Sequence, residues 1–291
     1  MLYARKCSPS NPYNASPSSH SVTRNRMHVI TVINAKGGCG KSTIAMNLSA
    51  GLASQGYRTL LIDMDPQAQV TQWLGLGDGL TSQNTLVMVM AGKQTLGAVI
   101  QPTTIANLSF VASAEELEHL GRRITDQEGY HLLFTRAISE VTPDFDFVVL
   151  DSPNQISPIM ENAIFPADLF IVPFESTKAV KSYGNVFKLI LNLRGGEPLT
   201  LHVLSNISLK GVHHRIEQLM AADGIEVAET EIRPCGWLAQ ADEHGGSIFD
   251  YRPHSKGAQD FAKLRLEVLR MLERPLPESE AEPRELLEVN N

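Results

Sequence analysis

Residues 36–43 of the chain read Lys36-Gly37-Gly38-Cys39-Gly40-Lys41-Ser42-Thr43. The stretch follows an apolar run at 28–34 and precedes a second apolar segment that starts at Ile44, which predicts a strand, a tight glycine turn and a helix. Glycines let consecutive backbone N–H groups converge on an anion, and the positive end of the following helix lies behind them. We expect Lys41 to reach the β- and γ-phosphates of a nucleotide and the Ser42 hydroxyl to bind Mg²⁺.

A second lysine, Lys36, stands where an ordinary phosphate loop needs none. The pattern KGGxGK(S/T) at 36–43 resembles the deviant Walker A loop of the ParA/MinD family. The resemblance implies that these eight residues bind ATP and that Lys36 reaches across a homodimer to the partner's nucleotide. It also implies that Lys36 and Lys41 act in catalysis, in an ATPase that is weak alone and accelerated by a partner protein.

Two aspartates end the next apolar run, 58–67, whose continuous hydrophobicity is typical of a parallel strand buried on both faces. Asp63 and Asp65 are two residues apart, so they project to the same face where the strand ends. Carboxylates at this end of a strand beside a phosphate loop are well placed for Mg²⁺ or for the attacking water. The run Asp63-Met64-Asp65-Pro66-Gln67 also resembles the family's Walker A′ element, which implies that Asp65 orients the water and Asp63 lies near the metal.

A third carboxylate ends the run Phe145-Asp146-Phe147-Val148-Val149-Leu150-Asp151. A hydrophobic strand that ends in aspartate indicates a Walker B element, in which Asp151 would hold Mg²⁺ through water. The pattern is common, and it gains weight here because it stands third in order, after the phosphate loop and Asp65. The family usually has D-x-P-P at this point, whereas the chain has Asp151-Ser152-Pro153-Asn154 and lacks one proline.

Strand and helix patterns alternate along the rest of the chain. We expect short helices within 68–107, a strand at 108–112, helices near 114–124 and 128–141, a strand at 168–174, a helix at 177–194, a strand at 201–206 and a terminal helix from 259. Repeated strand-then-helix units predict an α/β fold with a doubly wound, mostly parallel sheet, here a P-loop NTPase of the deviant Walker A type. The nucleotide should lie at the carboxyl ends of the strands.

Residues 232–258 carry a further resemblance to the family, whose members have an "IPRxxxLxEA" segment followed by "PI…YDPxSKGA". The second part is matched closely by Ser247-Ile248-Phe249-Asp250-Tyr251-Arg252-Pro253-His254-Ser255-Lys256-Gly257-Ala258. The first part has Ile232-Arg233-Pro234, which inverts proline and arginine, and lacks the glutamate. Asn206 falls where MinD-like relatives place an asparagine that contacts adenine, which implies the same role here.

The helix expected at 177–194 carries Lys178, Lys181 and Lys188 within about 80° of one another, at 100° per residue. Such a stripe could lie on DNA phosphates, and it could equally be a solvated helix face. The whole chain has a formal net charge of −7, so any DNA binding must come from a local patch of this kind.

Composition indicates one domain, because 291 residues that are 43% hydrophobic can bury one sizeable core. We expect the ATPase domain at 27–273, a disordered arm rich in Ser, Pro and Asn at 1–26, and an acidic disordered tail at 274–291. Met27 is an alternative start. The three cysteines show no metal-ligand spacing, and no apolar run approaches the ~18 residues of a membrane span.

Three functions are compatible with the family resemblance. The first is a cytoplasmic, nucleoid-associated ATPase for plasmid or chromosome segregation, which uses ATP and Mg²⁺, binds nonspecific DNA and responds to a ParB-like adaptor. The second is a MinD-like membrane ATPase, which would need a basic amphipathic C-terminus that the acidic tail contradicts. The third is an iron–sulfur reductase, for which the cysteines are unsuitably placed. The first is favoured, and a relative that positions another cargo, such as a protein cluster, stays open.

Overall fold

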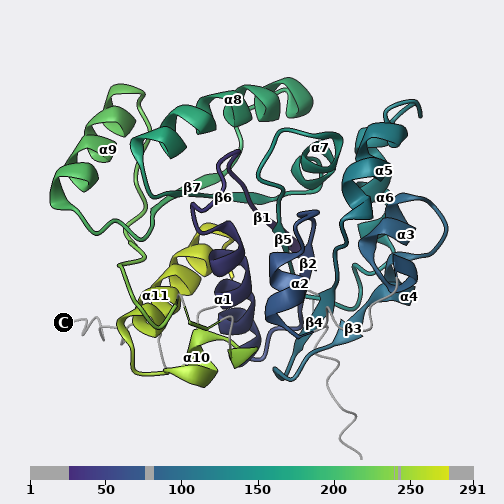
Figure 1. The fold of residues 1–291 in the computed structure, drawn as a ribbon, viewed down its shortest axis with the longest axis horizontal. Helices are drawn as coiled ribbons and strands as arrows, with labels where there is room; N and C mark the ends of the chain where they lie inside the picture. Colours follow the sequence, from purple (N-terminus) through teal and green to yellow (C-terminus); the bar gives the residue numbers. More distant parts are fainter. Residues whose placement is uncertain (1–25, 76–81, 239, 242–243, 275–291) are drawn as a thin grey trace, which may run out of the picture.

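Seven strands form one sheet across the middle of the molecule, in the order β3-β4-β2-β5-β1-β6-β7 (Figure 1). The computed structural model describes residues 26–75, 82–238, 240–241 and 244–274. The strands are β1 (His28–Val32), β2 (Thr59–Asp63), β3 (Gln101–Pro102), β4 (Leu108–Val111), β5 (Phe147–Asp151), β6 (Leu169–Phe174) and β7 (Thr200–Leu204). All neighbouring pairs are parallel except β3 and β4, so the carboxyl ends of six strands lie at one edge.

Helices cover both faces of the sheet, as the apolar runs in its strands require. The helices are α1 (Lys41–Ser54), α2 (Gln69–Trp73), α3 (Leu86–Met90), α4 (Leu96–Val99), α5 (Glu116–Ile124), α6 (Leu133–Ser139), α7 (Pro158–Ile164), α8 (Thr177–Arg194), α9 (Lys210–Ala222), α10 (Ile248–Tyr251) and α11 (Lys256–Met271). In β1, Ile30 and Val32 join the core that contains α1 and α11, whereas Val29, and Ile33 directly after the strand, face the opposite layer. Figure 1 shows α7, α8 and α9 across the sheet from α1 and α11.

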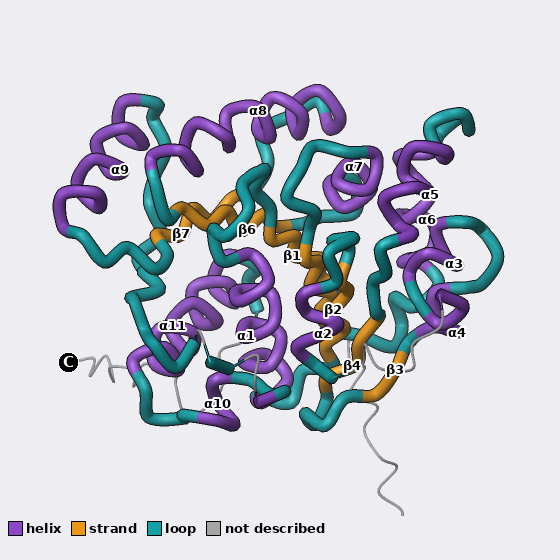
Figure 2. Tube along the Cα trace, viewed as in Figure 1, coloured by secondary structure: helices purple, strands orange, loops and turns teal. Residues whose placement is uncertain are grey.

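The doubly wound, mostly parallel sheet confirms the predicted fold class, and Figure 2 shows its strands between the two helical layers. The helix expected at 128–141 is shorter than predicted. Gly129 adopts a left-handed φ of 71°, residues Tyr130–Leu132 form a 3₁₀ turn, and α6 starts only at Leu133. Strand β3 and helix α9 are not among the elements expected from the sequence.

Both ends of the described fold are tied to the amino edge of the sheet, where β1 and β5 start. Arg26 pairs with Asp168 at 2.5 Å. The Arg274 guanidinium is buried and lies 5.1 Å from the centre of the Phe147 ring. From the sequence, Arg26 is expected to end the disordered arm and Arg274 to begin the acidic tail. The other residues of these two segments, 1–25 and 275–291, lie outside the described residues. None of the described helices has the length and hydrophobicity that a bilayer-spanning segment needs.

Candidate active site

The phosphate loop joins the carboxyl end of β1 to the start of α1. Gly38 and Gly40 have left-handed φ values of 76° and 93°, which L-residues with a Cβ rarely adopt. A Cβ at Gly40 would also lie only 3.1 Å from Ser205 Oγ. Gly40 caps α1 without a side-chain hydrogen bond, so the first N–H groups of this helix remain available to an anion.

Lys41 is buried at 6% exposure directly behind this loop. Its ammonium donates to the Lys36 carbonyl at 3.2 Å, and the buried Cys39 thiol donates to the same oxygen at 3.0 Å. An ammonium has three N–H donors, and within the described residues this carbonyl is the one acceptor that Lys41 has. Two donors of a buried cation are therefore free for phosphate oxygens, so the loop fits a nucleotide triphosphate.

Lys36 lies nearer the surface, with 35% of its side chain exposed. Its ammonium donates to the Gly37 carbonyl at 2.5 Å and lies 3.6 Å from the Glu175 carboxylate. Sequence reasoning missed Glu175, although it directly follows β6 and therefore stands at the same edge of the sheet as the phosphate loop. The residue predicted to reach a partner subunit is thus held by a carboxylate of its own chain.

Asp63 and Asp151 end the neighbouring strands β2 and β5 and stand opposite each other in the register. Neither carboxylate oxygen of Asp151 has a hydrogen-bond partner among the described residues, although both are buried. Burial raises the pKa of Asp151 to about 7, against the opposing effects of the Ser42 hydroxyl and the Lys41 ammonium. A buried carboxylate without a partner beside a serine hydroxyl fits Mg²⁺, because buried charges are paired or bind metals.

The Asp63 carboxylate is engaged differently from that of Asp151. One of its oxygens accepts from the Asp65 N–H, and the other accepts from the N–H and the hydroxyl of Thr71. Burial and the neighbouring Asp151 charge raise the pKa of Asp63 well above its ordinary value, and the two Thr71 donors oppose this. The structure therefore brings both predicted metal-site aspartates together, with free oxygens on only one of them.

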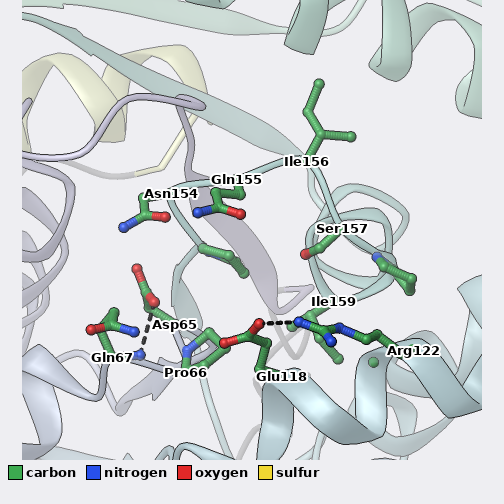
Figure 3. A pocket seen from close by; sticks show the side chains of 13 residues that line it. Asp65, Pro66, Gln67, Glu118, Arg122, Asn154, Gln155, Ile156, Ser157 and Ile159 are labelled. Carbon is green, nitrogen blue, oxygen red and sulfur yellow. Dashed lines mark hydrogen bonds and ion pairs between the residues drawn. The ribbon is translucent and has the colours of Figure 1, made fainter.

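Asp65 borders a pocket of about 250 Å³ between the loop after β2, helix α5 and the loop after β5. Figure 3 shows its carboxylate pointing toward the side of the pocket that carries Asn154. One carboxylate oxygen accepts from the Gln67 N–H at 3.0 Å. Burial raises the pKa of Asp65, although the Gln67 N–H and the Lys41 charge favour its ionised form. A carboxylate that lines a pocket and lies within range of the Lys41 charge can hold a water molecule in place.

A second pocket, of about 200 Å³, adjoins the phosphate loop on the side of β7. It is lined by Gly38, Cys39, Gly40, Thr43, Ser205, Asn206, Ile232, Arg233, Cys235 and Leu238. The predicted adenine contact Asn206 thus lies beside the loop, where its N–H donates to the Ile232 carbonyl at 2.7 Å. Arg233, from the inverted Pro-Arg pair, bonds through its guanidinium to the buried Asp260 on α11, at 2.6 to 3.0 Å. The charge of Arg233 is therefore paired with that of a carboxylate on α11.

Lys178, Lys181 and Lys188 lie on α8 and are exposed, and none of them lines the pocket of Asp65 or the pocket of Asn206. Within the described ranges none of these three lysines has an ion-pair partner. They remain free to contact a partner from solvent.

Comparisons with known proteins agree with this geometry. The chain is 27% identical to the chromosome-partitioning ATPase Soj of Treponema pallidum over 247 residues, which is 82% of this chain and 96% of the relative. It is 30% identical to the cell division protein PomZ of Myxococcus xanthus over 238 residues, 78% of this chain and 73% of that protein. Among solved structures, the cell division ATPase MinD of Pyrococcus furiosus superimposes with a TM-score of 0.68 at 21% identity, over 84% of this chain and 99% of that one.

A complex of McdA from Cyanothece with ATP superimposes with a TM-score of 0.73 at 20% identity, over 87% of this chain and 98% of that one. The family model described as "AAA domain" matches residues 27–195, which is more than half of the chain. That range contains the phosphate loop, Asp65 and Asp151, and the relatives named above are a chromosome-partitioning ATPase and a cell division protein. The chain therefore belongs to the ParA/MinD family of P-loop ATPases.

Proposed function

We propose that the chain is an ATP-driven switch of the partition type, which dimerises around two Mg·ATP molecules and then binds DNA nonspecifically at the nucleoid. The observation that carries the proposal is the position of Lys36. It is a second, partly exposed lysine of the phosphate loop, in which the buried Lys41 is already placed to bind the phosphates of the nucleotide. A cation in that place is redundant within one subunit. In a symmetric dimer it would add positive charge to the partner's triphosphate and couple nucleotide binding to dimerisation.

The residues of the site divide the work of phosphoryl transfer. Residues 37–43 hold the phosphates, Lys41 and Lys36 balance their charge, and Asn206 with its neighbours lines the base pocket. Ser42 and Asp151 would hold Mg²⁺, which when bound neutralises charge on the transferring group. Asp65 orients the attacking water from the pocket that Figure 3 shows. No residue has to form a covalent intermediate, because positioning and electrostatics suffice for this reaction.

DNA binding requires a cationic surface whose position depends on the nucleotide. Helix α8 begins at Thr177, two residues after Glu175, which is paired with Lys36. Movement of Lys36 toward a partner would therefore act on the start of the helix that carries Lys178, Lys181 and Lys188. A second row of exposed cations, Lys256, Lys263 and Arg270, lies along α11 at intervals of seven residues, on the opposite side of the sheet. We assign DNA to α8 because Glu175, directly before this helix, pairs with Lys36 of the phosphate loop, whereas α11 is connected through Asp260 and Arg233 to the pocket that holds Asn206.

The experiment compares two triple variants of equal charge, one on each helix. Affinity for a duplex of arbitrary sequence is measured with a slowly hydrolysed ATP analogue at several salt concentrations. Replacing Lys178, Lys181 and Lys188 by alanine should reduce the salt slope by about 2.7 per subunit if each lysine contacts a phosphate. The alanine variant of Lys256, Lys263 and Arg270 should keep the wild-type slope. The reverse outcome would place the DNA on α11, and an absence of ATP-dependent binding in the wild type would overturn the DNA proposal itself.

The partner that accelerates hydrolysis is proposed to be a DNA-bound, ParB-like adaptor. A second candidate function is the positioning of another cargo, such as a protein cluster, and the 30% identity to PomZ, which is named a cell division protein and not a partition protein, keeps a role other than DNA segregation in view. Both functions use the same switch and differ in the adaptor. Stimulation of ATP hydrolysis by an adaptor bound to its DNA site supports partition, whereas stimulation only by a cargo-bound protein supports positioning.

A further inference from the structure

The loop that carries Asp65 is fastened at both ends to a single buried carboxylate. The Asp65 N–H donates to Asp63 Oδ1 at 3.1 Å, immediately after β2. At the other end of the loop, in α2, Thr71 donates to Asp63 Oδ2 twice, from its N–H at 3.0 Å and from its hydroxyl at 2.8 Å. Asp63 thus accepts hydrogen bonds from both ends of the loop formed by residues 64–70.

A third element fixes the direction of the Thr71 hydroxyl. The Ser113 N–H, just after β4, donates to Thr71 Oγ1 at 3.0 Å. Because an N–H can only donate, Thr71 Oγ1 accepts there and its own proton points to Asp63. Thr71 is only 2% exposed, so water does not compete for these bonds. The hydroxyl therefore joins β4, β2 and α2 at one point.

The loop between these bonds is held in a conformation that it would not adopt freely. Ala68 has φ 51° and ψ 39°, the left-handed region that is unfavourable for a residue with a Cβ. Its N–H donates to the Asp65 carbonyl at 2.9 Å, which makes the turn tight. Such conformations persist where the surroundings over-determine them, and they are frequent at functional sites.

We propose that Thr71 is a positioning residue for ATP hydrolysis, which acts through Asp63 to fix Asp65 beside its pocket. In this arrangement Asp63 holds the loop 64–70 in place, and Asp151 is the carboxylate that would bind the metal. Both lone pairs of Asp63 Oδ2 are occupied by Thr71, whereas both oxygens of Asp151 are free. The inference needs only the ATPase activity of the family, so it stands or falls independently of DNA binding.

The experiment compares Thr71→Val, which removes the hydroxyl at nearly equal volume, with Thr71→Ser, which keeps it. Thr135→Val is the matched control, because the buried Thr135 hydroxyl has no partner among the described residues. In nucleotide-free protein, hydrogen exchange of residues 64–71 reports on the loop itself. We expect exchange to be about tenfold faster in Thr71→Val, since a hydrogen bond to a charged group is lost. In the same variant kcat should fall about tenfold, while KM for ATP stays within about twofold.

Thr71→Ser should restore both exchange and kcat, and Thr135→Val should match the wild type in both. The proposal is overturned if Thr71→Val has wild-type exchange in the loop, or if its defect lies in KM with kcat unchanged. A Thr71→Ser variant as defective as Thr71→Val would also overturn it, because the methyl group would then be the part that matters. Should Thr71→Val unfold at the assay temperature, Thr71→Cys keeps a weak donor and must fall between serine and valine in loop exchange.

Discussion

The ammonium of Lys36 lies 3.6 Å from the carboxylate of Glu175 within one subunit. Lys36 belongs to the phosphate loop, and Glu175 stands between the end of β6 and the start of α8. If Lys36 is to reach the nucleotide of a partner, this pair must first open. The contact therefore opposes dimerisation, and removing it should shift the equilibrium measurably toward the dimer.

Glu175→Gln should promote dimerisation. A partly exposed pair is worth at most about 1 kcal/mol, and a symmetric dimer opens two such pairs, which corresponds to at most about a thirtyfold lower protein concentration at the dimerisation midpoint. Light scattering with a slowly hydrolysed ATP analogue measures this midpoint, with the exposed Glu197→Gln as the control for loss of a charge near the other end of α8. Lys36→Ala should act in the opposite direction and raise the midpoint by about two to four decades, since a charge-assisted contact is worth about 1.5–3 kcal/mol and the symmetric dimer loses two of them. Equal midpoints for Lys36→Ala and wild type would disprove the sandwich dimer.

Asp65→Ala should retain ATP binding and lose turnover. A positioned carboxylate typically contributes at least about a hundredfold to such a step, so kcat should fall by about that factor. Phosphate release measures the rate, and the dimer formed with ATP should persist correspondingly longer. The exposed Asp126→Ala is the control. Wild-type hydrolysis by Asp65→Ala, with DNA and adaptor present, would remove Asp65 from the mechanism.

Two glycine-to-alanine variants should change stability in opposite directions. Gly40→Ala forces a Cβ onto a φ of 93° and to within 3.1 Å of Ser205 Oγ, so the free energy of unfolding should fall by about 1–2 kcal/mol. Nucleotide affinity should fall with it, because the cradle is distorted. Gly184, inside α8, has open space around it, and Gly184→Ala should raise the free energy of unfolding by about 0.5–1 kcal/mol. Urea titrations measure both, and equal signs would refute the strain assigned to Gly40.

His202 should contribute a loss of folding stability as the pH drops below about 6.5, in a range where the raised pKa values of Asp63, Asp65 and Asp151 contribute with the opposite sign. Burial lowers the pKa of this imidazole from 6.5, against a smaller opposing effect of the Glu226 carbonyl. The unfolded chain therefore takes up the proton first, and stability is lost as the pH falls from 6.5 toward the lowered value. His28, whose pKa burial also lowers, adds to the same trend. Relative to the wild type, the free energy of unfolding of His202→Gln should therefore increase as the pH is lowered from about 7.5 to about 5.5, and parallel profiles for the two proteins would exclude His202.

The phosphate loop, Asp65 and Asp151 could be found from the sequence because each stands at the end of an apolar strand. Parallel pairing then brings the ends of separate strands to one edge, so order along the chain is enough to predict proximity. Glu175 also ends a strand, but its meaning depends on a distance to Lys36 that no local pattern reveals. Thr71 escaped notice because its hydroxyl connects Asp63 to Ser113, which is 42 residues away.

Helix α9 could not be predicted from the sequence for a different reason. Only Ile216 and Met220 are buried in this helix, so its apolar periodicity is too faint to separate from a polar loop. The helix expected at 128–141 shows the converse error, since its pattern continued across Gly129 although the backbone there turns left-handed. Exposure weakens the helical pattern in one case, and turn chemistry interrupts the helix in the other.

Arg26 is paired with Asp168 and Arg274 lies over the Phe147 ring, so the described fold is fastened at both ends to the amino edge of the sheet. The nucleotide pockets open at the other edge, where the strands finish. A fluorescent reporter joined directly at Arg26 or Arg274 would thus be attached on the far side from Lys36. Live-cell imaging with such a fusion would leave the surface that meets a second subunit unobstructed.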